Sequence, residues 1–388
     1  MPSTPRAALI VGIALFVGVA ATGSAQRGAP SASQNATSQA EVTRRVVTAA
    51  QALLATLDDS GRSKVQFPFD GPQKTRWSNL PSGAFQREGL RLGDLTQPQR
   101  DAVTALLSVA LSRDGVRKVG DIMRGDEVLR QTGGGRGPGR GPNGRDGGRG
   151  PQADGQDGAG RAGRGDGRGR GGPGGGGANF GEDLYYVAFV GTPSVTTPWM
   201  LQFGGHHLAI NLTMAGSDAT MAPSLPAAQP ASYTVEGRTI RPLGNENDKA
   251  FALINALDEG QRAQAVLPYR VADLVLGPGQ DGRTIQPEGI RGPALTPAQQ
   301  TMLWELVREW VGIVNDAFAE PRMAEIRSDL RDTYFAWSGP TTNGSAAYFR
   351  VQGPRLVIEY APQGNVDHIH TIYRDPTNDY GAKFARKS

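Results

Sequence analysis

Apolar residues recur at helical spacing in several stretches of the chain. In the first of them, Val42, Val46 and Leu53 fall on one side of a helix. Thr96 and Thr296 precede two later stretches, where a hydroxyl side chain can act as the N-cap of a helix. The pattern predicts helices over 41–57, 97–112 and 297–318, with a shorter helical piece over 116–129.

Short segments rich in aromatic and β-branched residues, separated by glycines and prolines, predict β-strands. These segments span 184–190, 199–203, 207–214, 334–337, 347–352, 356–360 and 368–373. The expected fold class is therefore α+β, with antiparallel strands and with helices packed on one face. The strands form two related sheets or one continuous sheet.

Two segments of the chain match later segments without gaps. Residues 88–91 read Glu-Gly-Leu-Arg and residues 288–291 read Glu-Gly-Ile-Arg, while 186–191 match 334–339. Such self-similarity indicates an internal duplication. Each copy is expected to be a helix followed by an antiparallel β-hairpin or meander. The first unit covers about 85–215 and the second about 285–375.

One segment carries the whole net charge. Between positions 133 and 177 there are eight arginines and four aspartates, a difference of +4, which equals the net charge of the chain. Glycine stands at nearly every second position, so the segment cannot bury enough apolar surface to fold, and we expect a disordered insert over 133–178. Because it lacks interleaved aromatic residues, no nucleic-acid partner is expected.

The first 25 residues have the pattern of an export signal. Arg6 precedes an apolar run from 7 to 23, and small residues follow at 23–25. We expect cleavage, a flexible leader over 26–40, a single duplicated globular domain over 41–388, and a periplasmic or secreted protein without a stable membrane span. An uncleaved N-terminal membrane anchor is the alternative. The chain has no cysteine, which excludes disulfides and thiolate metal sites.

The histidines are the main chemical signal, because phosphate-loop, zinc-protease and nucleophile-elbow motifs are missing. All four lie in two pairs, His206-His207 and His368-x-His370, each in a predicted strand. Residues two apart in a strand share a face, so His368 and His370 can bind one ion. Of the adjacent pair, we expect His207 to join them, because it shares its face with the polar Asn211.

Several other polar residues are candidates for the same site. Glu359 stands at the position of the second unit that corresponds to Asn211, and we include it with the four histidines as a candidate ligand. Side chains expected to orient a ligand or contact a substrate are Asn211, Asp367, Arg374, Asp375 and Arg350. Arg350 and Glu359 should also face each other across a hairpin as a structural ion pair.

Two or three imidazoles with one carboxylate suit Zn²⁺, Cu²⁺ or Fe²⁺. An open coordination position would permit hydrolysis of a small molecule or the use of oxygen, so the first interpretation is an exported metal-dependent enzyme. The alternative is a non-catalytic protein that binds a ligand or a structural ion. In a further alternative, the imidazoles only form hydrogen bonds in a polar core. No organic cofactor is indicated, and the sequence does not predict the oligomeric state.

Three strings resemble a known family. They are Gln202-Phe203-Gly204-Gly205-His206-His207-Leu208, Phe335-Ala336-Trp337-Ser338-Gly339 and the segment 367–376 with 378–381 after it. They resemble an uncharacterised family of mostly exported proteins catalogued as domain of unknown function 3500. The resemblance covers the chain from about residue 40 onward, apart from the insert. It implies kinship and a shared site on the histidine strings, but no particular reaction.

Overall fold

The computed structural model describes residues 32–133 and 179–384. Its helices are α1 (Ala32–Ala55), α2 (Asp59–Val65), α3 (Gln97–Ala110), α4 (Arg113–Gln131), α5 (Gly244–Ala256), α6 (Glu259–Ala265), α7 (Pro297–Val311) and α8 (Asp316–Ser328). The predicted signal peptide and, apart from Gly133, the predicted insert lie outside the described residues. None of the helices in the described ranges is long and apolar enough to cross a membrane.

The strands confirm the predicted α+β class. They are β1 (Gln66–Phe67), β2 (Leu90–Arg91), β3 (Tyr186–Val190), β4 (Trp199–Gly205), β5 (Leu208–Ala215), β6 (Asp218–Thr220), β7 (Leu225–Pro226), β8 (Tyr233–Val235), β9 (Arg238–Ile240), β10 (Ile290–Arg291), β11 (Tyr334–Ser338), β12 (Tyr348–Gly353), β13 (Leu356–Pro362) and β14 (Ile369–Arg374). One sheet has the order β1-β3-β4-β5-β6, with β2 on β3 and β7 on β5. Another has the order β10-β11-β12-β13-β14.

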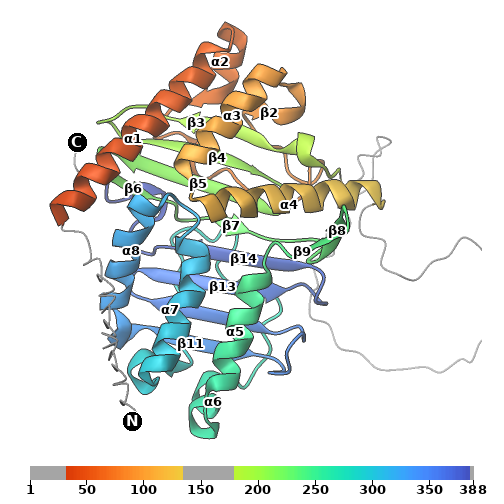
Figure 1. Cartoon of the computed structure of the whole chain (residues 1–388), viewed down its shortest axis with the longest axis vertical. Coiled ribbons are helices and arrows are strands. Elements are labelled where there is room, and N and C mark those ends of the chain that lie inside the picture. Colours follow the sequence, from red (N-terminus) through yellow and green to blue (C-terminus); the bar gives the residue numbers. More distant parts are fainter. Residues whose placement is uncertain (1–31, 134–178, 385–388) are drawn as a thin grey trace, which may run out of the picture.

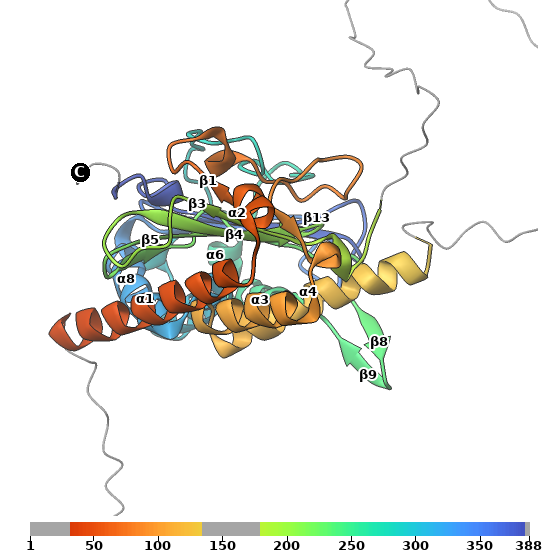
Figure 2. The ribbon, with the colours of Figure 1, turned by 90° about the horizontal axis from the view of Figure 1, so that it is seen from above.

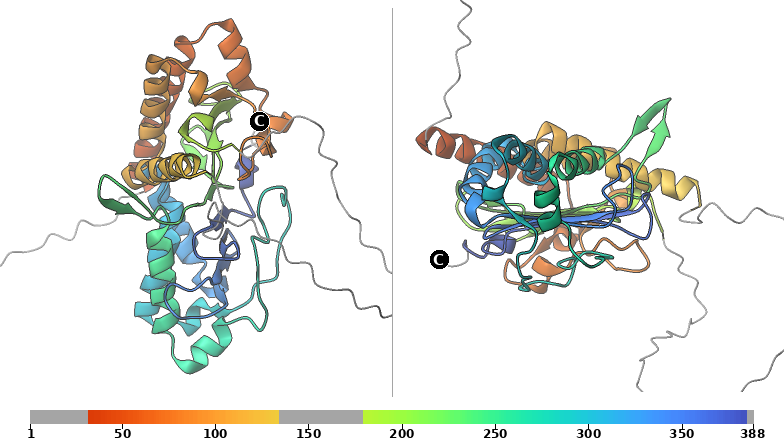
Figure 3. Two further views of the ribbon diagram at one scale, coloured as in Figure 1. Left: turned by 90° about the vertical axis from the view of Figure 1, so that its right-hand side faces the viewer. Right: turned by 90° about the horizontal axis from the view of Figure 1, so that it is seen from below.

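A short segment around β7 joins these two sheets. Within this segment, β7 pairs with β5 of the first sheet. Ser224 and Ala228, on either side of β7, form bridges to Tyr373 and Ile369 of β14 in the second sheet. The result is one layer of strands with the helices on one face and long loops on the other (Figures 1, 2 and 3). The seam between the two sheets therefore lies between β5 and β14.

The helices cover the sheet because each has one apolar face. In α3, for example, Val103, Leu106 and Leu107 are buried, and a capping box of Thr96 and Gln99 starts the helix. The first helix begins at Ala32, ahead of the predicted start at 41. The part of the predicted leader over 32–40 is therefore helical.

The predicted single helix over 297–318 is wrong. The structure ends α7 at Val311 and starts α8 at Asp316, with Asn315 as the N-cap of the new helix. The apolar pattern continues across this break because Ile313 and Val314 pack into the core of the first sheet rather than onto the second. Apolar spacing alone does not distinguish these two packing partners.

Strand pairing in the two sheets follows the offsets of the proposed duplication. Leu90 pairs with Val187 in the first sheet, and Ile290 pairs with Phe335 in the second. The offsets are 200 for the first member of each pair and 148 for the second, as in the sequence match. This agreement supports a duplication, although the common origin of the two units stays a prediction.

Candidate metal centre

His206 and His207 form the two-residue turn of the β4–β5 hairpin, since Gly205 pairs with Leu208 on either side of them. The prediction that this pair lies within a strand is wrong, and the alternation argument does not apply to it. His207, the second residue of this turn, has a positive φ of 60°, the region that a type II turn requires at this position. Its N–H donates to Asn79 O, and its carbonyl accepts from the N–H of Ala227.

His368 and His370 lie at the start of β14. His368 directly precedes Ile369, the first residue of the strand, and His370 pairs with Ala361 of β13. Their rings are 4.7 Å apart between centroids and nearly perpendicular. The two-residue spacing places both rings on the side that faces the hairpin turn, as the sequence predicted.

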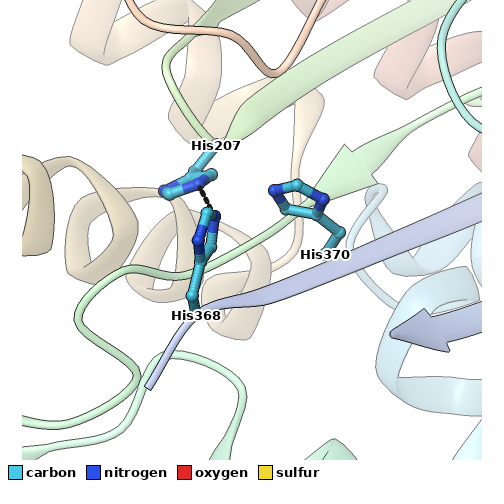
Figure 4. Close-up of side chains that lie close together, drawn as sticks. All are labelled: His207, His368 and His370. Atoms are coloured by element: carbon cyan, nitrogen blue, oxygen red, sulfur yellow. Dashed lines mark hydrogen bonds between the residues drawn. The ribbon is translucent and has the colours of Figure 1, made fainter. Parts of the chain in front are cut away.

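The structure brings His207, His368 and His370 together, with one nitrogen of each within 4.8 Å of the others. Figure 4 shows the three rings pointing toward a common centre. Nε2 of His207 lies 2.9 Å from Nε2 of His368. Two imidazole nitrogens bound at about 2.1 Å to one ion lie about 3.0 Å apart at a right angle and about 3.4 Å apart at the tetrahedral angle. Small ring movements would therefore let the three nitrogens bind one ion.

Burial keeps two of these imidazoles uncharged. The pKa of His207 lies well below its usual value because the ring is fully buried and because the neighbouring histidines would repel its positive charge. Burial, with a further contribution from His370, lowers the pKa of His368 to about 4. At neutral pH both rings are neutral, and the neutral imidazole is the form that binds metal ions.

His370 is oriented by residues from two loops. The Asn79 amide nitrogen lies 3.1 Å from Nε2 of His370 and donates to it, while Nδ1 lies 3.4 Å from Oδ1 of Asp273. This arrangement places the proton on Nδ1, and the lone pair on Nε2 accepts the hydrogen bond from Asn79. A metal-binding histidine commonly donates its other N–H to a carboxylate in this way.

A second group lies behind His207. Nδ1 of His206 is 2.5 Å from Oδ1 of Asp126, a buried residue of α4. The centroid of the His206 ring lies 3.6 Å from that of His207, with the planes tilted by 31°, and 4.9 Å from that of the Phe180 ring. Burial raises the pKa of Asp126, although the contact with His206 counteracts part of this rise. Arg87 holds the turn from the other side, because its Nη2 donates to the carbonyl of Gly205.

Most of the other predicted site residues make contacts away from the three rings. Asn211 contacts Gln202 and the carbonyl of Pro223. Asp367 accepts from the N–H of Ala231. Asp375 pairs with Arg322, and Arg374 pairs with Asp281 and Asp379. The predicted carboxylates Glu359, Asp367 and Asp375 lie outside both groups of potential metal ligands in the described ranges, namely the group of three histidines and the group around Asp126.

The predicted ion pair between Arg350 and Glu359 is also wrong. The two residues are cross-strand partners, as expected, but Arg350 pairs with Glu288 at 3.1 Å. Glu359 instead accepts hydrogen bonds from Tyr348 and from the backbone N–H groups of Val275 and Leu276. Its carboxylate therefore anchors the loop that contains Val275 and Leu276, on the face of the sheet that carries no helices.

Asn79, Asp126 and Asp273 were not predicted from the sequence. Each reaches a histidine from a segment that is distant in sequence, and none belongs to a recognisable motif. Their helix or loop positions carried no chemical signal on their own. Only the packing of α4 and of the two loops against the seam reveals them.

The fold and the site define an α+β protein with a candidate metal centre of three histidines at the seam of its sheet. The chain belongs to the family described as protein of unknown function (DUF3500), whose model matches residues 39–382. No curated protein and no solved structure matches the chain.

Proposed function

We propose that the protein is an exported metal-dependent enzyme in which His207, His368 and His370 bind one transition-metal ion. The observation that carries the proposal is the convergence of three imidazoles, whose ligand atoms lie within 4.8 Å of one another. In the described ranges this group contains no fourth residue of the His, Asp or Glu type. Catalytic zinc sites typically use three protein ligands and leave one position for water, whereas structural sites use four.

The nature of the ligands narrows the choice of metal. Imidazole nitrogen suits zinc, copper and iron, while calcium and magnesium prefer carboxylate and carbonyl oxygens. With an ion bound, the centre would supply Lewis acidity that makes a coordinated water acidic enough to attack a substrate near neutral pH. Zinc would favour the hydrolytic form of the proposal, and iron or copper would favour the form that uses oxygen.

The residues around the three histidines would hold a ligand in the tautomer that binds metal, and they would leave part of the site accessible. Asp273 favours the tautomer of His370 that carries its proton on Nδ1, and an ion bound at Nε2 would replace the hydrogen bond from Asn79. His207 is fully buried, whereas His368 and His370 are only half-buried. These two side chains are therefore partly accessible to solvent, which would allow a small substrate to approach.

A structural ion is the second candidate, and the position of the site favours it. His207 lies in the β4–β5 turn of the first sheet, while His368 and His370 lie at the start of β14 in the second, so an ion bound to all three would hold the two sheets together. In that role the ion would need a closed coordination shell, with a side chain or backbone oxygen in place of the water.

Elemental analysis of the purified mature protein tests the metal site itself. We expect close to one ion per chain in the wild type and loss of that ion in the His368→Ala, His370→Ala double variant. His206→Phe is the matched control, because it keeps a ring against His207 and removes none of the three ligands. Wild-type protein that stays free of metal after reconstitution would overturn the proposal. Loss of metal in His206→Phe would move the ion to the group of Asp126, His206 and His207.

Cobalt substitution distinguishes the open site from the closed one. Azide should shift the visible absorption of the cobalt protein if one position holds an exchangeable water. An unchanged spectrum at saturating azide would favour the structural ion. Export is tested separately, by fractionation of cells and by N-terminal sequencing of the mature chain, which should start near Gln26.

A further inference from the structure

Two buried polar atoms beside the metal centre have no hydrogen-bond partner. One is Nδ1 of His207 and the other is Oδ2 of Asp126. The two residues are each about 1% exposed, so water does not reach these atoms from outside. A buried polar atom without a partner costs roughly 1–3 kcal/mol, and such atoms commonly mark a functional requirement.

The two atoms have complementary chemistry. A histidine that binds a metal through Nε2 carries its proton on Nδ1, which then needs an acceptor. Oδ1 of Asp126 already contacts His206, which leaves Oδ2 as an unused acceptor in the same place. His370 has Asp273 as the carboxylate on its Nδ1, but His207 has no such partner.

We propose that Asp126 is the positioning carboxylate of His207, and that its Oδ2 accepts the Nδ1 proton of His207 when Nε2 binds the metal. This inference rests on the proposed metal site. Asp126, His206 and His207 each offer one ligand atom within 4.8 Å of the others. The carboxylate of Asp126 therefore lies near the His207 ring, and a small side-chain movement or one buried bridging water would join the two groups.

The surroundings of Asp126 suit this role. The residue is fixed on α4, and one of its oxygens is held by His206, whose ring is packed between Phe180 and His207. A single carboxylate would thereby orient two adjacent rings, one through each oxygen. Loss of such an outer carboxylate typically weakens metal binding 10- to 100-fold, because the ligand loses its preferred tautomer and orientation.

The test compares Asp126→Asn with Glu127→Gln in the full-length mature protein. The control makes the same carboxylate-to-amide change one residue further along α4, where Glu127 pairs with Arg130 and Gln131. Zinc affinity is measured by competition with a chromogenic chelator, and the cobalt spectrum is recorded for each protein. We expect about a 10- to 100-fold loss of zinc affinity and an altered cobalt spectrum for Asp126→Asn only.

A second measurement does not depend on how well the variant folds. In zinc-loaded wild-type protein labelled with ¹⁵N-histidine, the Nδ1 proton of His207 should be shifted downfield and should exchange slowly with water. Rapid exchange of that proton, or equal zinc affinity in wild type and Asp126→Asn, would overturn the role of Asp126 and leave the metal site intact. Wild-type protein that binds no zinc would overturn the metal site, and this inference with it.

Discussion

Nε2 of His207 lies 2.9 Å from Nε2 of His368, although the residues are 161 positions apart. Two adjacent residues between the sheets produce this contact. The N–H of Ala227 donates to the carbonyl of His207, and Ala228 exchanges hydrogen bonds with Ile369, the residue after His368. One short segment thus sets the distance between the two halves of the site, so the candidate metal centre and the seam of the sheet form a single structural unit.

Removal of the metal should lower stability, because the ion would join both sheets. A ligand that binds only the folded state at 100 times its dissociation constant adds about 2.7 kcal/mol to the free energy of unfolding. We expect calorimetry to show a lower Tm after treatment with a chelator and its recovery on adding the ion. The His368→Ala, His370→Ala variant should show no such response. A chelator effect of equal size in that variant would contradict the prediction.

The metal-free protein should lose stability as the pH falls below neutrality. The pKa of His368 is lowered from 6.5 to about 4, so the unfolded chain binds more protons than the folded protein between these values. The stabilising contribution is complete above about pH 6.5 and disappears as the pH falls toward 4. Allowing for solvent screening at this half-buried ring, it is of the order of 1 kcal/mol. Urea titrations of wild type and His368→Asn between pH 7.5 and 4.5 should show the shallower dependence in the variant.

Gly205→Ala should damage both the fold and the metal site. A Cβ atom at this position would lie 2.8 Å from ring carbons of Tyr185, whose hydroxyl donates to the carbonyl of His206. We expect a loss of about 1–3 kcal/mol in the free energy of unfolding, together with weaker metal binding, because the hairpin turn must shift. Gly120→Ala on α4 is the control, since no atom lies within 4 Å of its added Cβ. Equal effects of the two substitutions would contradict this account.

A buried ion pair connects the helices of the two halves. Nζ of Lys118 on α4 pairs with Glu246 on α5, which is fully buried, and it donates to the carbonyl of Glu309 on α7 at 3.0 Å. Lys118→Met would leave the Glu246 charge without its partner, at an expected loss of about 3–5 kcal/mol in unfolding free energy. Adding Glu246→Gln should restore part of that stability. Chemical denaturation of the two single variants and the double variant measures the coupling energy between Lys118 and Glu246. If the losses in unfolding free energy of the single variants simply add in the double variant, the predicted coupling is wrong.

Local patterns in the sequence predicted much of the secondary structure. The helix behind Thr96 begins where the N-cap signal places it, because capping depends on residues within one turn. The His-x-His spacing likewise predicted two rings on one face of a strand. The division of 297–318 into two helices was not predicted, because Ile313 and Val314 are buried by the other half of the molecule.

The sequence by itself determined the α+β class and the family, and it singled out the four histidines as candidates for a metal site, since composition and short-range spacing carry that information. Only the tertiary structure decided that His206 and His207 form a turn, that Glu359 anchors a loop, and that Asp126 lies behind the site. The contacts of Glu359 and Asp126 join residues that are far apart in the chain. The approach of His368 to His207 likewise depends on the segment around β7, which bridges the two sheets, and no local pattern encodes that pairing.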